Sequence, residues 1–167
     1  MLDEFQAGAE AVGAIVKRFT SLAEAVTYIR ELAGEGEMLA THLPEKIREA
    51  LSGAIFAHPE KAAHVGLCIS FAKAGIAETG SLLLELADPR ERGFTALPPV
   101  HAVFIEASSL VPDLYALHDI LSQELTSATT AYLSLTSGPS RTADIERVLT
   151  IGVHGSKELH VLVLEGE

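Results

Sequence analysis

The chain has 167 residues, 48% of them hydrophobic, and carries 12 Lys and Arg against 23 Asp and Glu, for a formal net charge of −11. This length and composition predict one domain, residues 1–167, with one sizeable core. Phosphate-rich partners need a cationic surface, so the acidic balance argues against nucleic-acid binding and against binding to anionic membranes.

Cysteine usage limits the redox and metal chemistry that the chain can carry out alone. Its one cysteine, Cys68, allows no internal disulfide and no multi-thiolate cluster, so it cannot by itself hold an iron–sulfur centre. No apolar run reaches the roughly 18 residues that span a bilayer, and the N-terminus lacks the features of a signal peptide. We therefore expect a cytoplasmic protein that is not exported and does not insert into membranes.

Helical and strand-like patterns alternate through the first half of the chain. One expected helix begins with Ser21 and Glu24 in capping-box spacing, in which the two side chains satisfy free backbone N–H groups, and ends at Gly34 and Gly36. The expected helices of this half span 5–12, 22–32 and 44–51, and the expected strands span 14–16, 38–41, 65–69 and 81–86.

The second half continues this alternation. The pair Pro98-Pro99 precedes an expected strand, and Pro112 is expected to open an amphipathic helix that runs to about Leu125. The other expected elements are strands at 100–105 and 131–135, a helix at 142–149 and a strand at 160–164 that is apolar enough for burial on both faces. This order predicts an α/β fold with a largely parallel sheet and helices on both sides.

The segment from Leu133 to Glu146 offers one candidate ligand site, because it runs from the expected strand through small residues into the expected helix. A helix start presents unpaired N–H groups, and Arg141 adds a fixed charge, so the segment could receive a phosphate or a carboxylate. In the alternative, Ser140 only caps the helix and Arg141 pairs with an acidic neighbour. The candidate ligand-binding residues here are Ser137, Gly138, Ser140, Arg141, Thr142 and Asp144.

Two shorter segments also place polar groups beside glycines. Residues 75–81 hold Glu78, Thr79 and Gly80, which could meet a ligand if the loop lies at the carboxyl edge of the sheet, or could form a plain turn. His154 lies in a glycine-flanked turn, where it could contact a ligand or carry a proton, although such a residue more often bonds across the turn.

The seven histidines do not predict a metal site. The chain has no HExxH motif, no histidine pair at helical spacing and no thiolate partner near a histidine. His101 lies at the start of an expected strand and, like His154, is expected to have a structural role more often than a chemical one. Cys68 is expected to be a buried small hydrophobe. We expect no cofactor and no metal.

Several linked motifs, in order and spacing, resemble the LutC/YkgG family of lactate-utilisation proteins, which is built on the LUD domain. The resemblance covers about the last two-thirds of the chain. It is carried by Ile76–Ser81, Leu97–His101, Val111–Leu114, Ser137–Glu146, Gly152–Gly155 and Glu158–Val161.

This resemblance implies a three-layer α/β/α sandwich around a mainly parallel sheet, of the NagB/RpiA/CoA-transferase-like kind. It also implies a role in oxidising L-lactate to pyruvate, as one component beside iron–sulfur partner proteins. The component would be auxiliary rather than redox-active, and the resemblance assigns it no catalytic step.

The resemblance transfers some residues and departs at others. Lys73 stands where relatives more often have an acid, and Cys68-Ile69-Ser70 replaces a Gly-aliphatic-Thr pattern. The matching motif residues are Glu78, Thr79, Gly138, Ser140, Arg141, Thr142, Asp144 and His154.

Two other functions stay open at this point. In the first, the chain is an enzyme or sensor that takes a small anion or an acyl-CoA-like ligand in the same cleft, with Glu78 as nucleophile or base and Arg141 as the anion clamp. In the second, it is an interaction scaffold with an exposed apolar patch.

Overall fold

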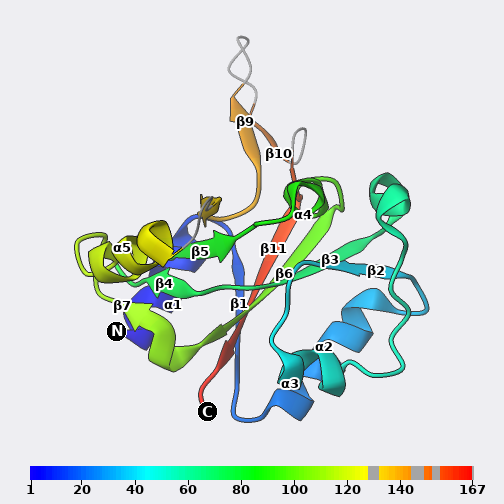
Figure 1. The fold of residues 1–167 in the computed structure, drawn as a ribbon, viewed down its shortest axis with the longest axis horizontal. Helices are drawn as coiled ribbons and strands as arrows, with labels where there is room; N and C mark the ends of the chain where they lie inside the picture. Colours follow the sequence, from blue (N-terminus) through cyan, green and yellow to red (C-terminus); the bar gives the residue numbers. More distant parts are fainter. Residues whose placement is uncertain (128–131, 144–148, 152–154, 167) are drawn as a thin grey trace.

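The computed structural model describes residues 1–127, 132–143, 149–151 and 155–166, and its centre is a sheet of five parallel strands (Figure 1). β11 (Glu158–Leu164) pairs with β1 (Ile15–Phe19) on one side and with β6 (Val100–Glu106) on the other, so the two ends of the chain meet in the sheet. This position buries six of the seven residues of β11, which confirms the expected two-sided burial. In spatial order the strands are β1 (Ile15–Phe19), β11 (Glu158–Leu164), β6 (Val100–Glu106), β3 (Leu67–Phe71) and β2 (Met38–Ala40).

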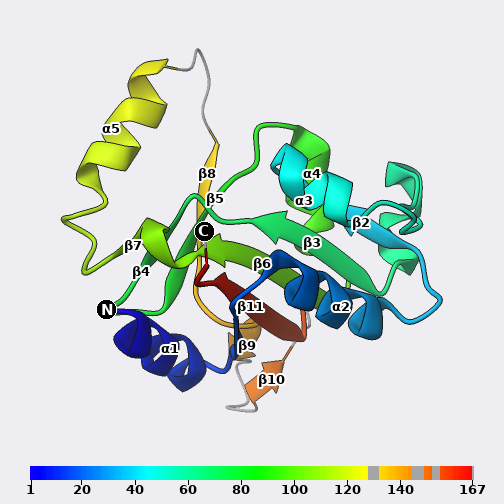
Figure 2. The ribbon, with the colours of Figure 1, turned by 90° about the horizontal axis from the view of Figure 1, so that it is seen from below.

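Helices α2 (Leu22–Ala33) and α3 (Glu45–Ala50) cover one face of this sheet (Figures 1 and 2). Their side chains Ile29 and Ile47 pack against Phe104 of β6 in one buried cluster. The expected start of α2 is confirmed, since the Ser21 side chain accepts a hydrogen bond from the backbone N–H of Glu24 at 3.4 Å. The helical periodicity of the sequence thus identifies this layer.

The opposite face is covered by helix α1 (Leu2–Ala11) and by a second sheet. Phe5 of α1 and Leu84 of the second sheet share a buried cluster with Val161 of β11. The expected α/β fold with a mainly parallel sheet is confirmed, and this outer layer contains strands as well as helices. In spatial order the second sheet is β7 (Leu110–Val111), β4 (Ala74–Ile76), β5 (Ser81–Glu85) and β8 (Leu133–Thr136).

Short helical segments complete the fold. α4 (Pro89–Phe94) places Phe94 in a small cluster with Cys68, which is fully buried as expected. Segment η1 (Pro59–His64) joins the same cluster, and segment η2 (Ala107–Ser109) links β6 to β7. No helix in the described part of the chain has the length and apolar content needed to cross a membrane.

The helix predicted at 142–149 is wrong. Arg141–Ala143 (β9) and Leu149–Ile151 (β10) pair instead as antiparallel strands, and this hairpin projects from the body in Figure 1. The backbones of the two strands hydrogen-bond to each other. β-branched residues such as Thr142 and Thr150 favour this extended backbone. The helix start that was expected to receive an anion is therefore absent at Ser140–Ala143.

The helix predicted from Pro112 begins later, as α5 (His118–Ser127). The backbone N–H groups of Ala77 and Glu78 donate to the carbonyl oxygens of Val111 and Pro112, which holds this stretch beside β4. Since these carbonyls bond across to another segment, the helix cannot start at the proline. Strands β4 and β7 and helix α4 also had no counterpart in the predicted elements.

Candidate functional site

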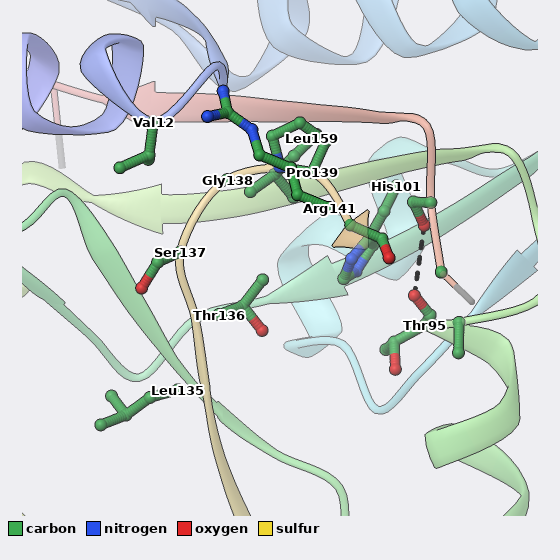
Figure 3. A pocket seen from close by; sticks show the side chains of 14 residues that line it. Val12, Thr95, His101, Leu135, Thr136, Ser137, Gly138, Pro139, Arg141 and Leu159 are labelled. Atoms are coloured by element: carbon green, nitrogen blue, oxygen red, sulfur yellow. Dashed lines mark hydrogen bonds between the residues drawn. The ribbon is translucent and has the colours of Figure 1, made fainter. Parts of the chain in front are cut away.

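A cleft of about 510 Å³ lies where the end of α1, the end of α4 and the first residues of β6 and β11 meet the segment that follows β8 (Figure 3). Four of the predicted ligand-binding residues line it: Ser137, Gly138, Ser140 and Arg141. The other lining residues are Val12, Thr95, Ala96, His101, Leu135, Thr136, Pro139, Gly155, Ser156 and Leu159.

Two glycines allow the cleft walls to come together. Gly138 has φ +68°, and a Cβ there would overlap the carbonyl oxygen of Val12, so the loop packs directly on the end of α1. At Gly155 a Cβ would lie 2.7 Å from that of Ser140, closer than side chains approach one another. The backbone N–H of Ser140 donates to the carbonyl oxygen of Ser156 at 2.9 Å, which fixes one wall against the other.

Arg141 is an exposed cation among the described residues of the cleft. Its guanidinium lies beside Val12 and Gly13, and Figure 3 shows it directed to the end of α1 and away from His101. The carbonyl end of a helix carries partial negative charge, which favours a cation there. An anion at this site would therefore depend on Arg141 and on hydroxyl groups, because the predicted helix start does not exist.

His101 lies at the floor of the cleft and had been given no site role from the sequence. It is 2% exposed, and its Nε2 lies 2.8 Å from the Oγ of Ser70, which is fully buried on the neighbouring strand β3. Burial lowers the pKa of His101 to about 4, so the imidazole is neutral near pH 7. The sequence signal was its place two residues after Pro99, as the second residue of an expected strand, which fixes the face of the sheet on which it lies but not the residues around it.

Ser156 is a second cleft residue that the sequence analysis did not identify. Its hydroxyl donates to the carbonyl oxygens of Thr95 and Pro98 at 3.2 and 3.1 Å, which ties the end of α4 to the start of β11. The bonds span about sixty positions of sequence, so no local pattern could have shown them.

The turn at Glu78–Gly80 contacts the cleft loop through hydroxyl groups. Thr79 Oγ1 lies 2.8 Å from Ser81 Oγ, which lies 2.6 Å from Ser137 Oγ. Gly80 packs against the backbone of α1, where a Cβ would overlap Ala9. The structure thus brings two of the predicted motifs together.

Other candidates stand apart from this cleft. Glu78 is exposed on its turn and, like Thr79, is not one of the described residues that line the cleft. The backbone of Thr142 lies in β9, and the candidates Asp144 and His154 lie outside the described residues.

The charges of the cleft differ from those of the molecule as a whole. The chain has 23 Asp and Glu, but none of them is among the described lining residues, where Arg141 is the charged side chain. Neutral His101 and several hydroxyl groups supply the remaining polarity. The described lining is suited to an anionic ligand, because Arg141 supplies a positive charge and the hydroxyl groups can donate hydrogen bonds.

A second cleft, of about 600 Å³, has the opposite character. It lies at the carboxyl ends of β2 and β3, and its lining includes Glu85, Asp88 and Glu91. Lys73 Nζ lies there, 2.6 Å from Glu85 and 2.5 Å from Glu124; burial opposes its charge, but these hydrogen bonds outweigh burial and raise its pKa. The described residues contain no group of three or more His, Cys, Asp or Glu that could hold a metal ion.

Comparison with known proteins places these features in a family context. A model of the LUD domain matches residues 57–164. Lactate utilization protein C of Bacillus velezensis is 34% identical over 107 residues, which are 62% of this chain and 44% of that protein. YkgG of Escherichia coli is 29% identical over 141 residues, which are 83% of this chain and 60% of that protein.

A solved structure supports the fold. The chain superposes with a TM-score of 0.69 on the crystal structure of a DUF162 family protein from Deinococcus radiodurans, at 16% identity, covering 98% of this chain and 95% of that one. The chain spans about half the length of the curated relatives it matches.

Proposed function

Because the chain belongs to the LUD domain family, the family of LutC and YkgG, we propose that it acts in the utilisation of lactate. In this proposal it is one component of a system that oxidises L-lactate to pyruvate beside iron–sulfur partner proteins. The relatives named lactate utilization protein C support the role, and the partners and the reaction are part of the proposal.

The chemistry of the chain favours an auxiliary part over a redox-active one. Its single cysteine, Cys68, is fully buried, and burial raises the pKa of this thiol to about 12. A buried thiol with that pKa stays protonated at neutral pH and is a poor nucleophile and metal ligand. The electrons of lactate would then pass through the partner proteins.

The observation that carries a specific role is the cleft lined by Ser137, Ser140, Arg141 and His101, whose described lining holds no acidic side chain in a strongly acidic chain. A small carboxylate is the ligand class that such a cleft admits, with Arg141 as the counter-charge. We propose that the chain binds a small carboxylate there while its partners carry out the oxidation.

The test is lactate-dependent dye reduction by the reconstituted system, run with the chain, without it, and with an Arg141→Ala variant. We expect no activity without the chain and at least about a tenfold loss with Arg141→Ala, the size of one charge-assisted hydrogen bond. Arg30→Ala is the matched control, because Arg30 lies on α2, across the sheet, and bonds the carbonyl of Ser52. Full activity without the chain would refute the proposed role.

A second candidate function is an enzyme or sensor that takes a small anion or an acyl-CoA-like ligand in the same cleft. The volume of about 510 Å³, within the range of small-molecule sites, favours it. The nucleophile or base expected at Glu78 is not supported, because that residue does not line the described part of the cleft. Thermal stabilisation by acetyl-CoA but not by pyruvate or L-lactate would favour this candidate.

A further inference from the structure

A third cavity, of about 270 Å³, lies at the edge of the central sheet beside β2 and shares no lining residue with the two clefts described above. We call it the edge cavity. Strand β2, at the right of Figure 1, is the last strand of the sheet. On its outer side the segment at 55–57 bonds only the first residue of the strand: the N–H of Met38 donates to Ile55, and the carbonyl of Met38 accepts from Ala57. The rest of this edge borders the cavity.

Most of the cavity wall is apolar. Leu39 and Phe94 belong to a buried cluster that forms part of it, and Phe56 is 44% exposed there. The other apolar lining residues are Ala40, Leu43, Ala57 and Pro59. Such a wall takes an aliphatic chain or an aromatic ring out of water, and this is the main source of affinity in small-molecule sites.

Thr41 places a hydroxyl in this wall. Its N–H donates to the carbonyl oxygen of Ile69 at 2.9 Å, which continues the ladder of β2, so Thr41 and Leu39 face the same side of the sheet. Thr41 is 7% exposed, and no residue in the described ranges hydrogen-bonds its hydroxyl. Every fully enclosed side-chain nitrogen or oxygen in those ranges has a partner, so this hydroxyl opens into the cavity. A ligand atom there would supply the missing hydrogen bond.

Arg48 is the charged side chain among the described lining residues of the edge cavity. One of its nitrogens, Nη2, donates to Glu45 on the same helix, and its side chain is 58% exposed. A guanidinium has five N–H donors, so Arg48 keeps donors for a ligand. No Asp or Glu is among the described lining residues, so a cation would meet only repulsion from Arg48.

We propose that the edge cavity binds a small carboxylic acid whose body is an aliphatic chain or an aromatic ring. The body lies between Leu39, Phe56 and Phe94, and the carboxylate accepts a hydrogen bond from Thr41 and is balanced in charge by Arg48. A volume of about 270 Å³ is just below the range of drug-sized sites, so the ligand is small. This site is independent of the cleft that holds Arg141, and its ligand differs in having an apolar body.

The first test measures binding of acetate, butyrate, hexanoate and hexylamine to the full, unaltered chain. Affinity is expected to rise about fourfold for each methylene group that enters the cavity, and hexylamine should bind far more weakly than hexanoate. Nuclear Overhauser effects should connect the methyl group of hexanoate with the rings of Phe56 and Phe94. An affinity that does not depend on chain length, or contacts with other rings instead, would overturn the proposal.

Thr41→Val removes the hydroxyl and keeps the shape of the side chain. Because the hydroxyl has no partner in the described residues, the variant without ligand should be at least as stable as the wild type. Its affinity for hexanoate should fall about fivefold. Lower stability together with unchanged affinity would show that the hydroxyl serves the protein and not a ligand.

Arg48→Gln tests the charge. It should weaken hexanoate binding about tenfold and leave the binding of hexan-1-ol unchanged. Arg90→Gln is the matched control, because Arg90 is also an exposed arginine paired with a nearby acid, Asp88, and does not line the cavity. Equal losses for hexanoate and hexan-1-ol in Arg48→Gln would contradict a carboxylate ligand.

A last variant separates the edge cavity from the cleft of the proposed function. Arg141→Ala should leave hexanoate binding unchanged, because Arg141 does not line the edge cavity. Loss of hexanoate binding in Arg141→Ala would place the acid in that cleft and refute the edge site. The result of the dye-reduction assay does not bear on this outcome.

Discussion

At the scale of single residues, two glycines explain how motifs far apart in sequence reach the same place. Gly80 and Gly138 both have positive φ, +64° and +68°; Gly80 lies against the backbone of α1 and Gly138 against that of Val12, which directly follows α1. A side chain at either position would overlap that backbone as well as strain its own. Their presence in the sequence suggested sharp turns, but the helix they contact could be known only from the fold.

Gly80→Ala is therefore expected to destabilise the protein by about 3 kcal/mol or more, since the new Cβ would overlap Ala9. Gly53→Ala is the matched control: Gly53 has φ +84° and open space around its Cβ position, so only backbone strain of about 1 kcal/mol applies. Denaturant unfolding of the two variants measures the difference. Equal losses would show that contact with α1 does not restrict position 80.

His101 makes stability depend on pH. Burial lowers its pKa from 6.5 to about 4, so below pH 6.5 the unfolded chain binds a proton that the folded chain does not. Its contribution to stability is thus complete above pH 6.5 and is lost as the pH falls toward 4, at about 1 kcal/mol per pH unit. We expect unfolding curves between pH 6.5 and 4.5 to show this slope, and His101→Gln to reduce it. An identical slope in His101→Gln would assign the effect to other groups.

At the scale of elements, local sequence patterns predict an element correctly where that element makes its own backbone hydrogen bonds. Helix α2 has a serine cap and a repeating apolar face, and both predict it without reference to the rest of the chain. The segment at 142–149 carries residues that suit a helix as well as a strand, and the antiparallel pairing of β9 with β10 decided the outcome. Likewise, the N–H groups of Ala77 and Glu78, which follow β4, bond the carbonyls at 111 and 112, and α5 begins only at His118.

The cap of α2 gives a prediction at this scale. Ser21→Ala should destabilise the protein by about 1 kcal/mol, because the N–H of Glu24 loses its acceptor. Ser21→Asp should stay near the stability of the wild type, since aspartate caps equally well. Chemical denaturation at neutral pH compares the two, and a loss of the same size in both variants would rule out capping as the cause.

At the scale of the whole molecule, the sheet unites the two ends of the chain. β1, from the first twenty residues, pairs along its full length with β11, from the last ten. The LUD domain match begins at residue 57, so β1, β2 and helices α1, α2 and α3 all precede it. These elements supply one strand on each edge of the sheet, both helices that cover one face and the helix that covers part of the other.

Residues 57–167 alone are therefore expected not to fold cooperatively, because both faces of the sheet would lose their helical cover to water. Circular dichroism during heating should show a cooperative transition for the full chain and none for the shortened one. A sharp transition in the shortened chain would show that the first 56 residues are dispensable for the core.

The sequence by itself determined the α/β class, the long capped helix, the two-sided burial of β11 and the family motifs, because each depends on local periodicity or on residue types at fixed spacing. It also pointed to Ser137–Arg141 as a ligand segment. Only the tertiary structure decided that this segment leads into a hairpin instead of a helix, that His101 and Ser156 lie in the same cleft, and that Glu78 does not line it. Those facts depend on contacts between residues far apart in the chain, which local patterns do not encode.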